Sequence, residues 1–183
     1  MAQLDVLFNG YGGEGVASTV SLIRDENLVA VVDPGMVPNR NVILDPLHHL
    51  GVRVADVTDV IISHHHPDHT INIALFPQAT VHDHWATYHN DVWTARPAEG
   101  VRLSPGVGLL ETPGHTPQDI TTLVDTDAGV AALTHLWVYE GAGEDRLATD
   151  PDLLDQNRAR VLGLADLIVP GHGPTYRTDR VPV

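Results

Sequence analysis

Short apolar runs recur along this chain, and each one ends at a polar or glycine-rich stretch. Runs of this length, rich in valine, isoleucine and leucine, are typical of strands that are buried in a folded protein. We predict strands over residues 4–8, 19–23, 28–32, 58–62, 80–82, 108–111, 120–125, 130–133 and 167–169. The glycine-rich segment 10–15 predicts a mobile loop between the first two strands.

Two helices interrupt this succession of strands. Asn39 is placed to cap a helix that runs to about His49. Asp150 caps a second helix, which Pro151 opens and which runs to about Leu164. Strands, a helix, further strands and a closing helix predict an α/β fold with two packed sheets and helices outside them. We expect residues 1–183 to form a single domain, which is long enough to bury a two-sheet core.

Composition narrows the classes of function and partner. The formal net charge is −14 and all ten basic residues are arginine. Such a surface repels phosphate backbones, so nucleic acid is a disfavoured partner. Cysteine is absent, which excludes disulfides, a thiolate nucleophile and cysteine metal ligands. No apolar stretch approaches membrane-spanning length and the first residues carry no signal-peptide pattern, so we expect a cytoplasmic protein that binds no membrane.

The most informative segment is the loop that follows the apolar run 60–62. It packs four imidazoles and one carboxylate into six residues, namely His64, His65, His66, Asp68 and His69. The pattern His64-x-His66-x-Asp68-His69 offers the nitrogen and oxygen ligands that Zn²⁺ accepts. Two imidazoles that are two residues apart on an extended backbone share one side of it. Pro67 fixes a turn, from which Asp68 and His69 can face the same cavity.

Three more histidines stand where such a site would need them. Each follows a strand-like run and begins or lies within a polar loop: His115, His135 and His172. With these motifs the chain resembles the metallo-β-lactamase superfamily, and the resemblance covers nearly its whole length. The resemblance implies a four-layer αββα sandwich with a metal site at the edges of the two sheets. Within the superfamily the chain is most similar to the metallo-β-lactamase domain-containing protein 1 type, through segments 72–77, 103–106, 150–162 and 170–174.

The resemblance also implies which residues would hold metal. One site would be formed by His64, His66 and His115. A second site would be formed by Asp68, His69 and His172. Asp33 stands where the family keeps an aspartate that braces the metal loop, and an ordinary turn residue is the alternative interpretation. We expect zinc, one or two ions per chain, with iron or manganese as alternatives.

His135 departs from the family pattern, in which an aspartate at this position bridges both metals. A neutral imidazole has a single lone pair for metal and cannot bridge as a carboxylate does. His135 would therefore bind only the second metal, point away and leave one metal, or bridge as an imidazolate. We expect its ring to face the site, with one firmly held metal and a second of lower occupancy.

The predicted function is that of a metal-dependent hydrolase acting on a small molecule. A metal-bound hydroxide would attack an ester, thioester, lactone, amide or phosphoester. Asp68 would orient the water or carry its proton, and the metal together with a protonated His135 would stabilise the oxyanion. Three alternatives remain: a mononuclear Fe(II) dioxygenase of the persulfide dioxygenase kind, a nuclease, and a non-catalytic metal-binding protein. The sequence leaves the substrate and the oligomeric state open.

The remaining histidines receive other interpretations. His48 and His49 lie near a helix C-terminus, where we expect them at the surface. His65 is expected to point away from its ligand neighbours. The segment 82–93 carries three histidines with Trp85, Tyr88 and Trp93, and it predicts either a substrate-lining flap or aromatic core packing.

Overall fold

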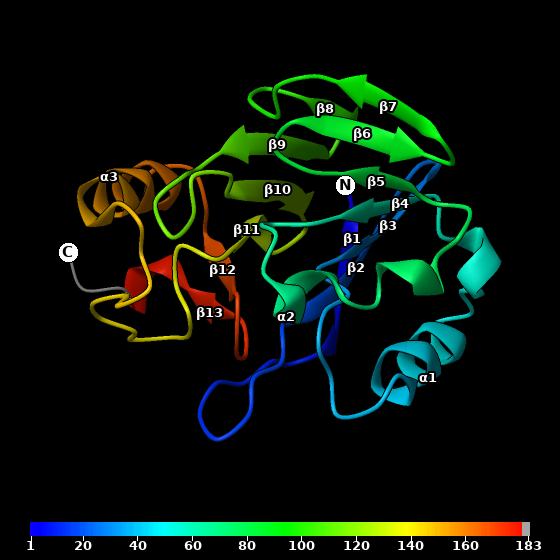
Figure 1. The fold of residues 1–183 in the computed structure, drawn as a ribbon, viewed down its shortest axis with the longest axis horizontal. Helices are drawn as coiled ribbons and strands as arrows, with labels where there is room; N and C mark the ends of the chain where they lie inside the picture. The colour runs from blue at the N-terminus through cyan, green and yellow to red at the C-terminus, as the bar shows by residue number, and fades with distance from the viewer. Residues whose placement is uncertain (181–183) are drawn as a thin grey trace.

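Two sheets form the centre of the protein in the computed structural model, which describes residues 1–180 (Figure 1). The first sheet has the spatial order β1 (Gln3–Phe8), β2 (Val20–Asp25), β3 (Leu28–Val32), β4 (Asp59–Ile61), β5 (Thr80–His82), β6 (Ala86–His89) and β7 (Val92–Ala95). The second has the order β13 (Tyr176–Arg177), β12 (Leu167–Pro170), β11 (Gly129–Thr134), β10 (Ile120–Thr126), β9 (Val107–Glu111) and β8 (Arg102–Ser104). The helices are α1 (Asn41–His49), α2 (Pro67–Thr70) and α3 (Pro151–Leu162).

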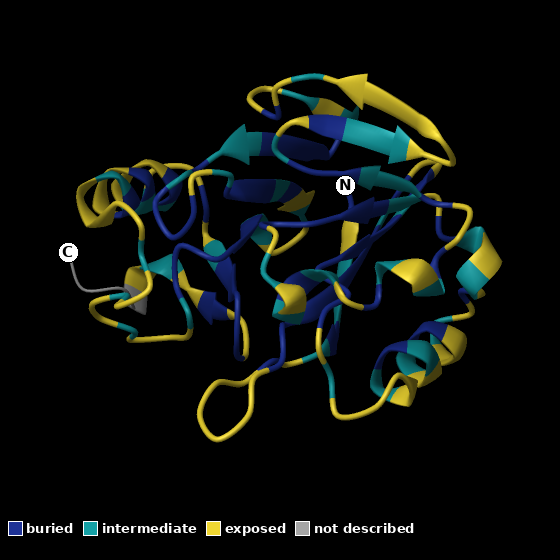
Figure 2. Cartoon of the chain, in the orientation of Figure 1, coloured by how far each residue is buried: buried dark blue, intermediate teal, exposed yellow. Residues whose placement is uncertain are grey.

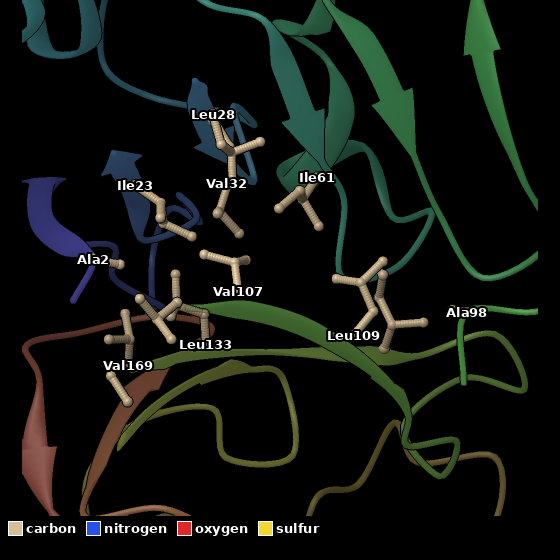
Figure 3. Packing of buried hydrophobic residues seen from close by; sticks show 14 residues of the cluster. Ala2, Ile23, Leu28, Val32, Ile61, Ala98, Val107, Leu109, Leu133 and Val169 are labelled. Atoms are coloured by element: carbon tan, nitrogen blue, oxygen red, sulfur yellow. The ribbon is translucent and has the colours of Figure 1, made fainter. Parts of the chain in front are cut away.

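Period-two alternation in the strands creates two faces on the first sheet. Ile23, Val32 and Ile61 point inward and pack with residues of the second sheet such as Leu109 and Leu133 (Figure 3). Their neighbours Leu22, Val31 and Val60 point outward and pack against Ile43 and Leu47 of α1. Figure 2 shows the resulting contrast between buried strands and exposed loops and helix faces.

Helix α3 covers the outer face of the second sheet. Its Leu154 and Val161 pack with Ala132 and Ile168 of that sheet. The order is therefore helix, sheet, sheet and helix, which confirms the predicted αββα sandwich. No helix within residues 1–180 is long and apolar enough to cross a membrane.

The nine predicted strands are all present, each end within two residues of its predicted position. Helix α3 begins as predicted, with the Asp150 side chain accepting a hydrogen bond from the Leu153 N–H. It ends at Leu162, before Gly163. Helix α1 begins at Asn41 rather than next to Asn39, although the Asn39 Oδ1 accepts the Asn41 N–H at 3.0 Å. Four short strands, β6, β7, β8 and β13, were not predicted.

One contact fastens the two sheets together away from the metal loop. Asp25, at the end of β2, accepts hydrogen bonds from the Ser104 hydroxyl at 2.6 Å and from the Gly106 N–H at 2.7 Å. Ser104 and Gly106 belong to the β8–β9 turn of the opposite sheet. The carboxylate therefore closes one edge of the sandwich.

Parallel pairing determines where the candidate site lies. Strands β3, β4 and β5 are mutually parallel neighbours, and so are β11 and β12. Parallel neighbours bring their carboxyl ends to the same edge of a sheet. Asp33 therefore lies beside the loop that begins at Ser63, and His135 lies beside His172.

Candidate metal centre

The metal loop leaves β4 at Ile61 and turns back at Pro67. His66 has extended backbone angles, and Pro67 occupies the first position of α2. This short helix returns Asp68 and His69 toward the loop from which they came. Gly35 allows the chain after β3 to lie against the backbone of α2, because a Cβ at this position would lie 1.7 Å from the Asp68 carbonyl oxygen.

Three histidine nitrogens converge at the first group of predicted ligands. The His66 Nδ1 lies 3.0 Å from the His64 Nε2 and 3.2 Å from the His115 Nε2. His115 reaches this point from the loop that follows β9. Three nitrogens at these separations are the arrangement of a tetrahedral ion's ligands with one position left open.

The second group of predicted ligands lies next to the first. The Asp68 Oδ2 is 3.5 Å from the His69 Nε2 and 3.5 Å from the His172 Nε2. The ligand atoms of Asp68, His69 and His172 lie within 4.8 Å of one another, as do those of His64, His66 and His115. The structure thus brings all six residues into two neighbouring clusters.

His135 lies between these clusters with its ring facing them. Its Nε2 is 3.1 Å from the His172 Nε2, and its ring centroid is 4.1 Å from that of His115. The ring occupies space that Gly171 leaves open, since a Cβ at Gly171 would lie 2.3 Å from the His135 Cδ2. His135 is buried, and its Nδ1 has no hydrogen-bond partner among the described residues.

Hydrogen-bond acceptors outside the clusters fix the orientation of three imidazole rings, those of His69, His115 and His172. Asp33 Oδ2 lies 2.8 Å from the His69 Nδ1, and the Ala17 carbonyl lies 2.8 Å from the His172 Nδ1. Asp145 Oδ2 lies 2.6 Å from the His115 Nδ1. Each acceptor receives the Nδ1–H, which leaves the Nε2 lone pair of that ring directed inward.

Asp33 braces the metal loop in a second way. Its Oδ1 accepts the Ser63 N–H at 2.7 Å and its Oδ2 accepts the Ser63 hydroxyl at 2.7 Å. The interpretation of Asp33 as an ordinary turn residue is wrong, because its carboxylate ties β3, the loop and His69 together. Its φ of 49° is unusual for a residue other than glycine and is maintained by these contacts.

Asp145 is a residue that the sequence analysis missed. It lies 30 positions after His115, in the irregular segment 138–149, where no periodic pattern or motif marks it. The one available signal is that residue 145 is acidic, and the chain has 24 acidic residues.

Burial favours the neutral form of four histidines of the centre, which contradicts the protonated form predicted for His135. It lowers the pKa of His64 and of His135 well below the ordinary 6.5, and the charges of neighbouring imidazoles lower it further. Burial also lowers the pKa of His115 and His172, although Asp145 and the Ala17 carbonyl oppose this. Neutral imidazoles are the form that binds metal. The His69 Nε2 is buried without a hydrogen-bond partner within residues 1–180, so the residues present fit a bound cation.

The other histidines lie outside the clusters. His65 points away, with its Nε2 3.0 Å from Asp83 and its ring against Trp85, and His48 and His49 are exposed at the end of α1. The segment 82–93 runs from the end of β5 into the β6–β7 hairpin. Trp85 and Trp93 are 48% and 65% exposed, so the interpretation of its tryptophans as core residues is wrong.

Comparison with known proteins gives several related chains. The relative from Xenopus laevis, Metallo-beta-lactamase domain-containing protein 1, is 36% identical, with 96% of this chain and 81% of the relative covered. The human protein of the same name is 35% identical, with 82% of this chain covered. The chain spans only 60% of the length of that human relative.

Solved structures share the fold. A structure described as a putative metallo-beta-lactamase from Thermotoga maritima superposes with a TM-score of 0.75 at 22% identity, covering 96% of this chain and 99% of the other. A quorum-quenching N-acyl homoserine lactone lactonase gives a TM-score of 0.67 at 20% identity, with 93% and 91% covered. The family model of the metallo-beta-lactamase superfamily matches residues 13–176. With this match and its αββα layers, the chain belongs to the metallo-β-lactamase superfamily.

Proposed function

We propose that this protein is a metal-dependent hydrolase of small molecules. The observation that carries the proposal is the convergence of the His64 Nε2, the His66 Nδ1 and the His115 Nε2 at 3.0 and 3.2 Å. The second cluster supplies a carboxylate beside this group, at Asp68. The quorum-quenching N-acyl homoserine lactone lactonase to which the chain is structurally similar shares this fold, which supports a hydrolytic reaction.

The metal would be held by His64, His66 and His115, and when bound it supplies Lewis acidity and lowers the pKa of a water molecule toward 7. Asp68 retains some exposure and its Oδ2 faces both His69 and His172. We assign to its carboxylate the orientation of the attacking water and the acceptance of its proton. Asp33 and Asp145 act indirectly, by holding His69 and His115 with their Nε2 atoms inward.

We further propose that His135 belongs to the second metal site alone. Its Nε2 lies 3.1 Å from the His172 Nε2, and the first site already has three nitrogen ligands in His64, His66 and His115. The second site would then have four ligands, Asp68, His69, His135 and His172. Neutral imidazoles in place of a bridging carboxylate leave the centre more positive, which favours an oxyanion in the substrate or during its reaction.

The substrate class follows from the chemistry of such a centre. An activated water attacks carbonyl or phosphoryl groups, so we propose an ester, thioester, lactone, amide or phosphoester of a small molecule. Lactones come first in a test because a lactonase shares the fold. The net charge of −14 argues against an extended polyanion such as RNA.

The decisive experiment measures metal content and hydrolysis together. We expect His115→Ala to lose bound metal and to lose hydrolysis across a panel of small esters, thioesters and lactones. His65→Ala is the matched control, because His65 lies in the same loop but points away from the clusters. Its partner Asp83 keeps hydrogen bonds from Trp85, Ala86 and Tyr88. Full metal content in His115→Ala would show that the ligand assignment is wrong.

A second candidate rests on the same departure at His135. Without a shared carboxylate the two clusters can fill independently, and a single Fe(II) with open positions would support dioxygen chemistry. Metal analysis of untagged, unheated protein distinguishes the two candidates. Iron as the major metal, with oxygen consumption on a persulfide and no hydrolysis, would replace the hydrolase proposal.

A further inference from the structure

A cavity of about 640 Å³ lies outside the metal centre, between α3 and the segment 138–149. Figure 1 shows both elements at the end of the molecule that carries β13. Trp137, Leu154 and Leu162 give the cavity apolar walls. Its volume falls within the range of small-molecule sites, which are mostly apolar with a few polar groups.

The wall formed by the second sheet contains a polar group without a partner. Tyr176 lines the cavity, is 3% exposed, and its hydroxyl makes no hydrogen bond among the described residues. Buried hydroxyl groups almost always have a partner. Burial raises the pKa of Tyr176, and the nearby Glu140 carboxylate raises it further, so the hydroxyl stays protonated. A ligand atom that enters the cavity would satisfy this hydroxyl.

The charges around the cavity favour a cation. Four carboxylates line it, those of Glu140, Glu144, Asp145 and Asp155, and they face one guanidinium, that of Arg158. Arg158 is already engaged. It donates to the Leu136 carbonyl at 2.8 Å and to Asp155 at 3.0 Å, and it lies over the Trp137 ring at 5.9 Å. An anion would therefore meet a lining with four carboxylates and one guanidinium, and this guanidinium already has partners.

We propose that this cavity, here called the α3 cavity, binds a small apolar molecule that carries a protonated amine. The apolar body would lie against Trp137, Leu154 and Leu162. The ammonium group would donate to the Tyr176 hydroxyl oxygen and stand beside the negative charge of Glu140. This site is separate from the proposed hydrolytic centre, although Asp145 belongs to both, since it lines the cavity and accepts the His115 Nδ1–H.

Two probes with the same ring and opposite charge test the proposal on the full, metal-loaded chain by calorimetry. We expect 2-naphthylmethylammonium to bind with one molecule per chain and 2-naphthoate to bind at least about tenfold more weakly. Ala159→Trp should abolish binding, because Ala159 lines the cavity from an exposed position of α3 where a larger side chain disturbs no core. Equal binding of both probes, or full binding to Ala159→Trp, would overturn the proposal.

A second variant separates recognition from folding. Tyr176→Phe removes the unpaired hydroxyl, so we expect an unchanged melting temperature and about tenfold weaker binding of the ammonium probe. Tyr139→Phe is the matched control, because Tyr139 is exposed and does not line the cavity. Full binding by Tyr176→Phe contradicts the proposed contact. A native dimer that Ala159→Trp dissociates and that binds neither probe would mean that a second copy covers this surface, which also overturns the proposal.

Discussion

At the scale of single residues, the centre depends on which ring nitrogen each histidine turns inward. The sequence identifies the histidines and, through the resemblance to the family, one of the acceptors that hold them, Asp33. Asp145 comes from a segment without a pattern, and only the folded chain brings it within 2.6 Å of His115.

The first prediction at this scale concerns Asp145. We expect Asp145→Asn to weaken metal binding at the His115 site by about 10–100-fold, because the neutral amide holds the Nδ1–H less strongly. Competition with a coloured chelator measures the affinity. Glu144→Gln removes a charge from the adjacent exposed position and should leave the affinity unchanged. An equal loss of metal affinity in both variants would show that Asp145 acts through its charge alone and not through its contact with His115.

His135 gives the second prediction. His135→Asp introduces a carboxylate that can bridge both clusters, so metal content should rise toward two ions per chain with little change in melting temperature. The alternative is a structural histidine, in which case the substitution buries an unpaired charge and destabilises the protein. Metal analysis and thermal unfolding of both proteins distinguish these results. A variant that unfolds earlier and binds no additional metal would contradict the proposed ligand role.

At the scale of elements, the β8–β9 turn is attached to β2 through Asp25. The hydrogen bonds from Ser104 and Gly106 hold the pKa of Asp25 below its ordinary 3.8. A carboxyl group with a depressed folded-state pKa contributes stability above pH 3.8, and this stability is lost as the pH falls through the folded-state value.

We therefore predict that Asp25→Asn lowers the free energy of unfolding by about 1–3 kcal/mol at neutral pH. The difference from the unsubstituted protein should disappear in acid, below the folded-state pKa. Urea unfolding at pH 7 and at a series of pH values below 3.8 measures how the difference declines. The exposed Asp127 offers a matched control in Asp127→Asn. A deficit of equal size at every pH value would show that Asp25 acts through packing rather than through its charge.

The elements themselves were largely predictable, and the exceptions have a common cause. The nine predicted strands lie in apolar runs that are buried within the sandwich. The missed strands β6, β7, β8 and β13 are short and lie toward the sheet edges, and β7 is exposed throughout. Such strands form because a neighbouring strand offers backbone hydrogen-bond partners. The apolar pattern of the sequence does not reveal this pairing. The two clusters were predictable from the motif His64-x-His66-x-Asp68-His69 together with the resemblance to the family.

At the scale of the whole molecule, the metal centre joins the two sheets. His64, His66, Asp68 and His69 follow the first sheet's β4, whereas His115, His135 and His172 follow strands of the second. Without metal, inward lone pairs face one another across this junction. Metal should therefore stabilise the assembly of the sandwich as well as serve the reaction.

The corresponding prediction is a lower melting temperature after chelation. With metal at about 100 times its dissociation constant, binding contributes roughly 2.7 kcal/mol, or about 5–10 °C for a chain of this size. Thermal unfolding with and without EDTA, followed by addition of Zn²⁺, measures the effect. Removal of all metal with no change in melting temperature would show that the sheets hold the ligands in place unaided.

The space left by Gly171 has a consequence for how such a centre could change over generations. Gly171 does not have a left-handed backbone, and the three atoms nearest to a Cβ placed there all belong to the His135 ring. An alanine at 171 therefore collides with the ring while position 135 is histidine. Replacing His135 by the shorter aspartate first would remove this collision, whereas the opposite order passes through a chain in which the two side chains clash. Substitutions at these two positions would therefore depend on their order. Once alanine stood at 171, a return from aspartate to histidine at 135 would bring back the collision.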